Sequence, residues 1–548
     1  MQRDFAALSQ TTFDVLVIGG GATGAAIALD ATLRGLRVAL IEKNDFSGAT
    51  SAASSKLMHG GLRYLANGEV ALVREGLRER RVWQRIAKHL VRPLPFLLPT
   101  YTARMKSKTI MRLGLLAYDL LAFGRNIGMD AMQRMPSYRS LNVAQTLGLM
   151  PHLNREDMTG GMIYHDAQML SPERLCLAML RTAYEAGAQA VNYTQATGFI
   201  TQDGRVTGVK ACDKLSDEET IIQAHCVINA AGPWADMVMQ DAMQAPPPKK
   251  LVRSKGIHFL TRDVTHGTAL AIPIGDEHLF VLPWQGKSLF ATTDTKFDAS
   301  PDEVHPDPSD LDALLEKANA ALPGLKLQRK DIDYAYAGLR PLVADPATPD
   351  NATYGLSRGS EIVDHASEGG PAGLISALGG KWTTSRRLGE EVVDLAVTYL
   401  GHKGAQCRTR DTLLACTPRQ SLADFMDQMR ADYPHVPVEE MDRLSRLYGR
   451  LLPQLMAQNT SGLGKLRNPL LAARVSFALE HEMACKLEDV VLRRLIEGQT
   501  GAITGGQIRC IADYMAARLQ WSEPEKTQQL EQLDACLNTQ SVSPAKIG

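Results

Sequence analysis

The sequence lacks long hydrophobic runs, a net charge and closely spaced cysteines. No stretch of it approaches the ~20 consecutive apolar residues that a membrane-spanning helix needs. The 60 basic and 60 acidic residues balance, so no overall electrostatic field attracts nucleic acid. None of the 8 cysteines forms a C-x-x-C pair, which argues against a zinc or iron–sulfur site. We therefore expect reduced thiols and no metal ligands.

A signal peptide is also absent, because the first residues contain neither an apolar core nor a cleavage site. This favours a cytoplasmic protein. A hydrophobic content of 45% and a charged content of 22% are ordinary for a soluble globular protein. The 548 residues exceed what one hydrophobic core can organise, so we expect two or three domains.

Residues 13–42 have the pattern of a dinucleotide-binding unit. A short apolar strand leads into a G-x-G-x-x-G motif made of Gly19, Gly21 and Gly24. These glycines permit a tight turn, close approach to a diphosphate and packing of the next helix, whose N-terminus attracts an anion. Glu42 ends the second strand, where its carboxylate can accept hydrogen bonds from a ribose diol. The unit predicts FAD or NAD rather than NADP and leaves those two open.

The segment 45–64, DFSGATSAASSKLMHGGLRY, is crowded with small and hydroxyl-bearing residues. Within it, Ser54, Ser55 and Lys56 can hydrogen-bond a phosphate, and Gly60 and its neighbour allow close approach to a ring. We predict a tight loop laid against a planar ligand. A flexible surface loop is the alternative.

Residues 106–123 form an unusual apolar segment. It follows a charged amphipathic helix predicted over 70–90, after which Pro93, Pro95 and Pro99 break the pattern. Its basic side chains, Arg104, Lys106, Lys108 and Arg112, could contact the anionic headgroups of a membrane. Its apolar side chains Ile110, Met111 and Leu115 could then lie below the headgroups. A buried core helix with a basic end is the alternative, and the sequence leaves both open.

The remaining chain alternates between strands and helices and then becomes helical. An apolar strand from residue 227 ends at Gly232, whose turn suits a second close approach to the cofactor. Residues 250–295 alternate like an antiparallel sheet, a candidate wall for a substrate. Helical periodicity dominates from Ser421 onward, and the last twenty-five residues are polar and expected to fray.

Several motifs in fixed order carry a resemblance to a known family. They are the glycine unit, SSKLMHGGLRYL, VINAAGPW, FVLPW followed by ATTDT, GLRPL, GGKWTT and KLEDVVLRR. Together they resemble the FAD-dependent glycerol-3-phosphate dehydrogenases, most closely the bacterial aerobic, single-polypeptide type, over nearly the whole chain.

The resemblance implies an α/β fold of the glutathione-reductase and D-amino-acid-oxidase group with a Rossmann-like FAD domain. That domain would be discontinuous, built from 13–75, 150–240 and 335–400. An antiparallel-sheet substrate domain, carrying the membrane-facing segment, would use 76–149 and 241–334. The rest, 408–525, would be an all-α domain.

The resemblance also assigns residues. Arg340 and Arg358 match positions that clamp the substrate phosphate, as suits the planar fork of arginine. His258 matches a histidine that faces the substrate and could accept the hydroxyl proton. Lys381 and Thr383 would lie by the flavin and the substrate, and Arg63 and Tyr64 near the substrate. The cofactor set is Gly19, Gly21, Gly24, Glu42, Ser54, Ser55, Lys56, His59, Gly60, Gly232, Gly380, Lys381 and Thr383. His59 could touch the ring or only order its loop.

The expected activity is oxidation of sn-glycerol 3-phosphate to dihydroxyacetone phosphate by hydride transfer to FAD. Electrons would then pass to a membrane quinone, with the protein held peripherally on the cytoplasmic face of the inner membrane. Alternatives are a related polyol phosphate as substrate, an oxidase acting on an amine or amino acid, and a flavin-bearing membrane module without catalysis. The oligomeric state stays open, with a homodimer among the options.

Overall fold

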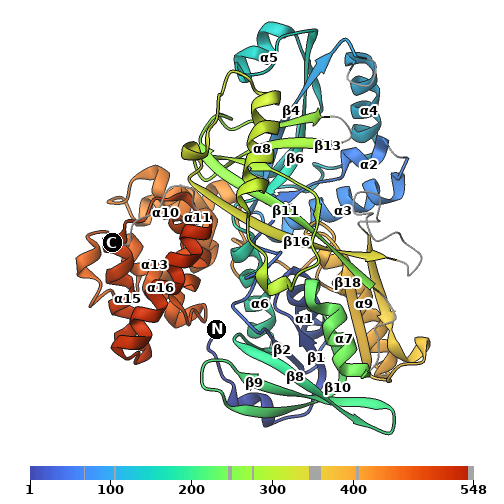
Figure 1. Ribbon diagram of the computed structural model, residues 1–548, viewed down its shortest axis with the longest axis vertical. Helices are drawn as coiled ribbons and strands as arrows, with labels where there is room; N and C mark the ends of the chain where they lie inside the picture. The colour runs from blue at the N-terminus through green and yellow to red at the C-terminus, as the bar shows by residue number, and fades with distance from the viewer. Residues whose placement is uncertain are drawn as a thin grey trace.

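The computed structural model describes residues 1–66, 68–103, 107–244, 250–274, 277–344, 359–402 and 406–540. Two β-sheets follow one another along the long axis of the molecule, and the C-terminal helices form a separate body beside them (Figure 1). This arrangement confirms the predicted fold class of an α/β part, a mainly antiparallel sheet and a helical C-terminal part.

The first sheet contains the predicted dinucleotide unit. Its central strand β1 (Phe13–Ile18) is buried along its whole length and pairs in parallel with a strand on either side. Because the chain continues in opposite directions from this point, the carboxyl ends of the neighbouring strands form a crevice of the kind that binds ligands. The spatial order is β17 (Ser360–Asp364), β18 (Leu374–Gly379), β10 (Glu219–Asn229), β1, β2 (Val38–Ile41) and β7 (Gln189–Val191), with β8 (Thr194–Gln202) and β9 (Arg205–Asp213) continuing from β10.

Three helices pack together against this sheet: α1 (Ala22–Leu33), α6 (Pro172–Glu185) and α9 (Ser385–Tyr399). Ser171 caps α6 by accepting a hydrogen bond from the backbone N–H of Arg174, and Pro172 occupies the first turn. A Cβ on Gly24 would lie 1.8 Å from the carbonyl oxygen of Gly19, so α1 approaches the strand as closely as a glycine allows.

The second sheet forms the predicted wall around residue 258. Strand β11 (Lys250–Arg262) pairs antiparallel with β14 (Lys287–Ala291) on one side and with β16 (Tyr334–Ala344) on the other. The remaining strands are β15 (Thr295–Lys296), β13 (Glu277–Trp284), β12 (Ala269–Ile274), β4 (Val91–Tyr101), β6 (Met158–Met169), β3 (Leu57–Met58) and β5 (Arg139–Leu141). Strands β3, β6 and β16 come from ranges that we assigned to the FAD domain, so this sheet takes strands from both predicted parts, and the domain ranges stay a prediction.

Strand β4 departs from the sequence interpretation. Its residues include Pro93, Pro95 and Pro99, which we read only as a break in the pattern, yet they lie within an eleven-residue strand. The three prolines stand at alternate positions, so their missing N–H groups share one edge of the strand. Strand β12 pairs with that strand only at Phe96 and Leu97, whereas β6 pairs along most of its length. Proline is tolerated where the ladder needs no donor.

Helix α4 (Lys108–Leu121) lies on the outside of the second sheet. One face is buried through Leu115 and Tyr118, whereas Leu113, Leu120 and Phe123 are 62%, 67% and 90% exposed. The segment is therefore not a fully buried helix. Of the three apolar side chains that we expected to face lipid, Ile110 is 37% exposed and Met111 is half-buried, whereas Leu115 is buried. Arg104 and Lys106 lie outside the described residues. Within the described part of the chain, no helix combines the length and the hydrophobicity needed to span a membrane.

The helical body begins after residue 420 and is attached to the dinucleotide unit by a buried ion pair. Arg494, from the KLEDVVLRR motif, forms two hydrogen bonds of 2.7 and 2.8 Å with Asp45, and both side chains are fully buried. The helices of the body are α10 (Leu422–Asp432), α11 (Val438–Tyr448), α12 (Leu452–Met456), α13 (Pro469–His481), α14 (Glu497–Thr500), α15 (Gly505–Leu519) and α16 (Glu523–Gln540). The other helices of the molecule are α2 (Leu62–Ala66), α3 (Val70–Ile86), α5 (Val143–Leu149), α7 (Ala235–Met243) and α8 (Pro308–Ala321).

The expectation that the last twenty-five residues fray is wrong for most of them. Helix α16 continues to residue 540, and it buries Leu533 and Leu537 in the core that the helical body shares with the second sheet. A few apolar residues are enough to hold a polar segment in an ordered helix when they pack into such a core. Residues 541–548 lie outside the described part.

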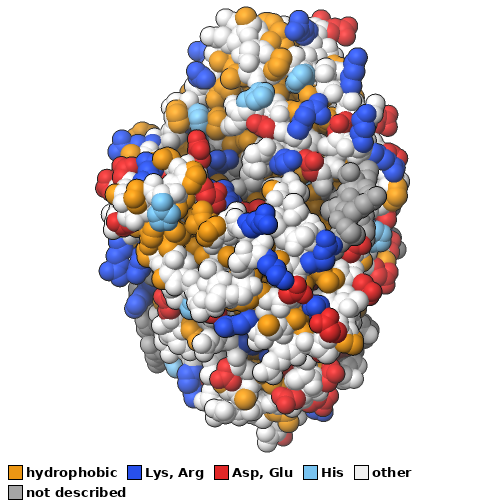
Figure 2. Space-filling model, turned by 90° about the vertical axis from the view of Figure 1, so that its left-hand side faces the viewer, with side chains coloured by type: hydrophobic (Ala, Val, Ile, Leu, Met, Phe, Trp, Pro, Cys, Tyr) orange, Lys and Arg blue, Asp and Glu red, His pale blue; other side chains and the backbone are white. Residues whose placement is uncertain are grey.

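The surface carries charges of both signs. On the face drawn in Figure 2, basic and acidic side chains are interspersed rather than gathered into fields of one sign. This distribution agrees with the balanced composition.

Candidate active site

Two cavities meet at the carboxyl ends of the parallel strands. The first has a volume of about 340 Å³ and the second about 300 Å³. Both are lined by Thr50, Pro341, Gly380, Lys381 and Trp382, so they adjoin. An elongated ligand could therefore extend from one into the other.

The first cavity collects most of the predicted nucleotide-binding residues. Gly19, Gly21, Glu42 and Gly232 line it, together with Gly380 from the turn after β18. Gly19 has φ +111°, and a Cβ there would lie 2.5 Å from the carbonyl oxygen of Ala230. A side chain at this position would block the cavity and strain the backbone, so the cradle depends on glycine.

Glu42 is held by backbone donors at the end of β2. Its carboxylate accepts hydrogen bonds from the N–H of Gly20 at 2.7 Å and from the N–H of Asn44 at 2.9 Å. Burial raises the pKa of Glu42, and these two hydrogen bonds oppose that shift. The carboxylate is thus fixed at the cavity wall, where each of its oxygens can accept a further hydrogen bond from a ribose hydroxyl.

Three predicted cofactor residues have other positions. Gly24 packs α1 on β1 and does not line either cavity. Gly60 lines a smaller adjoining cavity of about 220 Å³, and its N–H donates to Asp166. Lys56 is buried on the opposite side of its loop, where its Nζ donates to the carbonyl oxygen of Ala52 at 2.7 Å.

The environment of Lys56 explains its position. Its Nζ lies 3.8 Å from Glu173 and faces the rings of Trp284 and Tyr336 at 4.9 and 4.8 Å. Burial lowers the pKa of this ammonium, and Glu173 partly compensates. The ammonium therefore faces away from the first cavity and holds the loop from behind. Ser51, which the sequence analysis did not select, lines the first cavity instead, and its Oγ accepts a hydrogen bond from the N–H of Ala22.

The second cavity contains the predicted histidine. His258 on β11 is buried, stacks on Tyr336 with ring centroids 4.8 Å apart, and has its Nε2 2.8 Å from the hydroxyl of Ser55. Its Nδ1 has no hydrogen-bond partner among the described residues. Burial, followed by the charges of Arg340 and Lys56, lowers the pKa of His258 well below its usual value. The imidazole is therefore neutral at physiological pH and able to accept a proton.

Arg340 lies on β16, the strand next to β11, and lines the same cavity as His258. Its guanidinium donates to Ser254 Oγ at 3.1 Å, to Thr292 Oγ1 at 2.8 Å and to the carbonyl oxygen of Thr293 at 3.1 Å. The side chain can lie over β11 because position 256 is glycine, where a Cβ would come within 2.1 Å of Arg340 Nη2. Neutral acceptors thus hold the guanidinium beside the cavity, and Asp294 Oδ2 is 4.0 Å away.

Lys381, Thr383, Arg63 and Tyr64 line the same cavity. The Nζ of Lys381 lies 4.0 Å from the centre of the Tyr64 ring, and Arg63 faces that ring at 5.7 Å. The hydroxyl of Thr383 accepts a hydrogen bond from the N–H of His59 at 3.2 Å, which joins the two predicted loops. Helix α9 begins at Ser385, so Lys381 belongs to the preceding turn rather than to the helix start.

The structure thus brings together segments that are far apart in the sequence. Ser54, Ser55 and His59 also line the second cavity, next to His258, Arg340 and Lys381. Arg358 lies outside the described residues. The sequence reasoning missed Tyr336, which stacks on His258, and Thr292, which holds Arg340. The alternation of the YAYAGLRPL strand places Tyr336, Gly338 and Arg340 on one face, and this signal could have found Tyr336.

The fold and the first cavity have counterparts in known proteins. A family model described as "FAD dependent oxidoreductase" matches residues 14–395, and a second, "C-terminal domain of alpha-glycerophosphate oxidase", matches residues 390–526. The protein is therefore of the FAD-dependent oxidoreductase class, which selects FAD from the two cofactors that the glycine unit left open.

Individual relatives narrow this class. The chain is 34% identical to a glycerol-3-phosphate dehydrogenase of Synechocystis sp., over 90% of each chain. It is 33% identical to one of Mycobacterium leprae, over 97% of this chain and 89% of that protein. The crystal structure of the glycerol-3-phosphate dehydrogenase from Bacillus halodurans complexed with FAD superimposes with a TM-score of 0.80 at 28% identity, over 98% of this chain and 97% of that one. The chain belongs to this family of FAD-dependent glycerol-3-phosphate dehydrogenases.

FAD fits the residues present. The side-chain-free cradle of Gly19 and Gly21 at the start of α1 would hold the diphosphate, and Glu42 the ribose. The adjoining second cavity would take the ring system, next to Lys381 and Thr383. FAD supplies a hydride acceptor when bound.

Proposed function

We propose that the protein oxidises sn-glycerol 3-phosphate to dihydroxyacetone phosphate, transferring the hydride to FAD. One observation supports this most strongly. A cavity of about 300 Å³ next to the FAD-binding cradle is lined by three cationic side chains, Arg63, Arg340 and Lys381, and by the neutral imidazole of His258. A small phosphorylated alcohol needs this combination, because its phosphate requires fixed positive charge and its hydroxyl requires a base.

In this proposal Arg340 binds the phosphate. Its hydrogen bonds to Ser254 and Thr292 fix the plane of the guanidinium before a ligand arrives. A preorganised fork loses little conformational entropy when it binds a phosphate in bidentate fashion. Arg63 and Lys381 add charge from the other segments that line the cavity.

His258 would accept the proton of the substrate hydroxyl. Burial keeps the imidazole neutral, and stacking on Tyr336 together with the hydrogen bond to Ser55 fixes its plane. A proton accepted here would place a charge near Arg340 and Lys56, which favours its rapid release. Lys381 would stabilise negative charge that develops beside it.

We also propose that electrons leave to a quinone at the cytoplasmic face of the membrane, to which the protein binds peripherally. The exposed apolar side chains of α4 and of the turn after it support this, with Leu113 and Leu120 on the helix and Phe123 just beyond its end. The buried face of α4 packs through Leu115 and Tyr118 on the core that contains Phe96 and Tyr164, and these two also line the second cavity. The membrane-facing helix thus lies behind the apolar wall of the site.

Anaerobic titration of the FAD-loaded protein tests the reaction. Stoichiometric glycerol 3-phosphate should bleach the visible flavin absorbance, and equal amounts of glycerol or of an amino acid should not, because neither offers a phosphate. Bleaching by an amino acid alone would support the oxidase alternative. Comparison of short-chain quinones with oxygen as acceptors then tests the electron route, with quinone turnover expected to exceed peroxide formation.

A further inference from the structure

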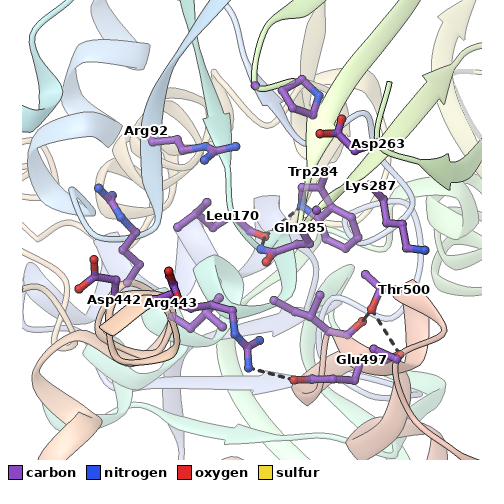
Figure 3. A pocket seen from close by; sticks show the side chains of 18 residues that line it. Arg92, Leu170, Asp263, Trp284, Gln285, Lys287, Asp442, Arg443, Glu497 and Thr500 are labelled. Atoms are coloured by element: carbon purple, nitrogen blue, oxygen red, sulfur yellow. Dashed lines mark hydrogen bonds and ion pairs between the residues drawn. The ribbon is translucent and has the colours of Figure 1, made fainter. Parts of the chain in front are cut away.

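A large cleft lies away from the catalytic cavities, between the second sheet and the helical body. Its volume is about 650 Å³, about twice that of either catalytic cavity. One wall is the turn between β13 and β14, with Trp284 and Gln285, and the other is built from α11 and α14. Figure 3 shows this cleft, with Arg92 extending into it above Leu170 and with Asp442 and Arg443 on the opposite side.

Four basic side chains line the cleft. Two of them form ion pairs with carboxylates, and the other two do not. Lys287 forms an ion pair with Asp333 at 2.9 Å, and Arg443 forms ion pairs with Glu440 and Glu497. Arg92 and Arg446, in contrast, make no ion pair within the described part of the chain.

Arg92 is fixed in place without being neutralised. Its Nη2 donates to Gln168 Oε1 at 2.9 Å, and Gln168 is in turn held by the carbonyl oxygen of Pro283 at 2.8 Å. The Nε of Arg92 is buried and has no partner among the described residues. Burial and then the nearby charge of Arg446 lower the pKa of Arg92. Arg92 as a whole is half-buried, and a buried donor such as its Nε is costly unless something else satisfies it.

Arg446 has carboxylates near it, but other groups bind them. Asp442 is one helical turn away, yet both of its oxygens accept hydrogen bonds from Arg430, at 2.7 and 2.5 Å. Asp130 pairs with Lys88 at 3.3 Å and also accepts from the backbone N–H of Leu422. Burial lowers the pKa of Arg446, and these two carboxylates only partly oppose it.

The pKa of the neighbouring His89 also indicates positive charge near Arg446. Burial and then Arg446 and Lys88 lower the pKa of the buried His89 to about 3. Of the four acidic residues that line the cleft, two are ion-paired with arginines other than Arg92 and Arg446, and the other two are Asp263 and Glu439. Asp442 and Glu497 are committed to Arg430 and Arg474, Asp263 accepts from Thr265 and Ser288, and Glu439 is exposed.

We propose that this cleft is a second anion site, which binds the phosphate group of a small polyhydroxylated phosphate monoester between Arg92 and Arg446. Two guanidinium groups match a phosphate in charge and in planar donor geometry. The cleft is larger than a bare phosphate requires and has the size of a small-molecule site. Asp263 and Glu439 line the same cleft and can accept hydrogen bonds from hydroxyls of the ligand, and they disfavour a second anionic group.

Calorimetric titration of the FAD-loaded protein tests this site. Inorganic phosphate and glucose 6-phosphate are the probes, and Arg340→Met serves as the background so that phosphate binding in the catalytic cavity is weakened. In this background we expect saturable binding, tighter for glucose 6-phosphate than for phosphate. Adding Arg92→Met or Arg446→Met should weaken it at least tenfold, and Arg446→Lys should restore part of it. Adding Arg329→Met, which removes a surface arginine paired with Asp312, should leave it unchanged.

The stability of the variants separates a ligand site from a structural role. Because Arg446 has no ion pair to lose, Arg446→Met should melt at the same temperature as the background protein or higher, without ligand. Glucose 6-phosphate should raise the melting temperature of the background protein but not that of Arg446→Met. Absence of saturable binding in the background protein would overturn the proposal, and so would an affinity in the Arg92→Met and Arg446→Met variants equal to that of the background protein. Neither result bears on oxidation at the other cavity, which wild-type flavin bleaching reports independently.

Discussion

The hydroxyl of Tyr118 donates a hydrogen bond to Asp166 Oδ2 at 3.1 Å, and this contact joins the outer helix α4 to a residue that lines the second cavity. Both side chains are buried. The other oxygen of Asp166 accepts from Arg80 at 2.5 Å and from the backbone N–H of Gly60 at 2.9 Å. A single carboxylate therefore connects the helix that we propose to meet the membrane with the loop that carries His59.

Replacing Tyr118 by phenylalanine should destabilise the protein by about 1–2 kcal/mol, because Asp166 is buried and loses one of its donors. The midpoint of urea unfolding measures this change. Tyr138→Phe is the matched control, since Tyr138 is half-buried at the edge of the same core and its hydroxyl makes no hydrogen bond among the described residues. Equal midpoints for the two variants would show that the Tyr118 hydroxyl contributes nothing.

Arg340→Ala should raise the KM for glycerol 3-phosphate roughly 10- to 150-fold, the equivalent of the 1.5–3 kcal/mol of a hydrogen bond to a charged group. Its FAD content should stay normal, because Arg340 lies in the second cavity and not along the glycine cradle. Steady-state kinetics and the flavin-to-protein absorbance ratio test both statements. Arg329→Ala is the control for loss of an arginine elsewhere. An unchanged KM would remove Arg340 from the phosphate site.

The local pattern was sufficient to predict the first sheet and its glycine cradle. The run from Phe13 to Glu42 encodes strand, turn, helix and strand in consecutive residues, so neighbouring positions determine the outcome. The positions of Lys56 and of β4 could not be predicted in this way. Lys56 turns away from the first cavity because Glu173 and two aromatic rings, distant in sequence, surround its ammonium. Strand β4 tolerates its prolines because β6 supplies the pairing.

The grouping of His258, Arg340 and Lys381 around one cavity was accessible only through the resemblance. No periodicity relates three residues that lie on β11, on β16 and in the turn after β18. The register of β11 with β16 places His258 opposite Tyr336, and it places Ser254 opposite Arg340. Such cross-strand pairs depend on the whole sheet, which the sequence of one strand does not specify.

Acidification should destabilise the protein through its buried histidines. The pKa of His89 is about 3 and that of His258 is well below 6.5, whereas in the unfolded chain both have ordinary values near 6.5. Below pH 6.5 the unfolded state therefore binds more protons than the folded state, and stability falls as the pH falls. Each such histidine contributes about 1.4 kcal/mol per pH unit once its unfolded form is fully protonated.

Urea unfolding of wild type and His89→Asn between pH 7.5 and pH 5 measures this effect. The variant should lose less stability over this range, because one of the titrating groups is gone. His266→Asn, which alters an exposed histidine, should follow the wild-type curve. Parallel curves for wild type and His89→Asn would contradict the assignment of His89 as a buried neutral group.

Leu120→Glu should release the protein from membranes without affecting reduction of the flavin. Leu120 near the end of α4 and Phe123 in the turn after it are 67% and 90% exposed, so a carboxylate at position 120 would have to enter the headgroup region beside anionic lipids. Sedimentation with vesicles of phosphatidylethanolamine and phosphatidylglycerol should show binding reduced at least tenfold. Leu519→Glu, on the exposed side of α15, is the control and should bind like wild type.

Anaerobic bleaching by glycerol 3-phosphate should be the same in wild type, Leu120→Glu and Leu519→Glu, whereas turnover with a quinone embedded in vesicles should fall only in Leu120→Glu. Unchanged sedimentation of that variant would place the membrane contact elsewhere on the surface.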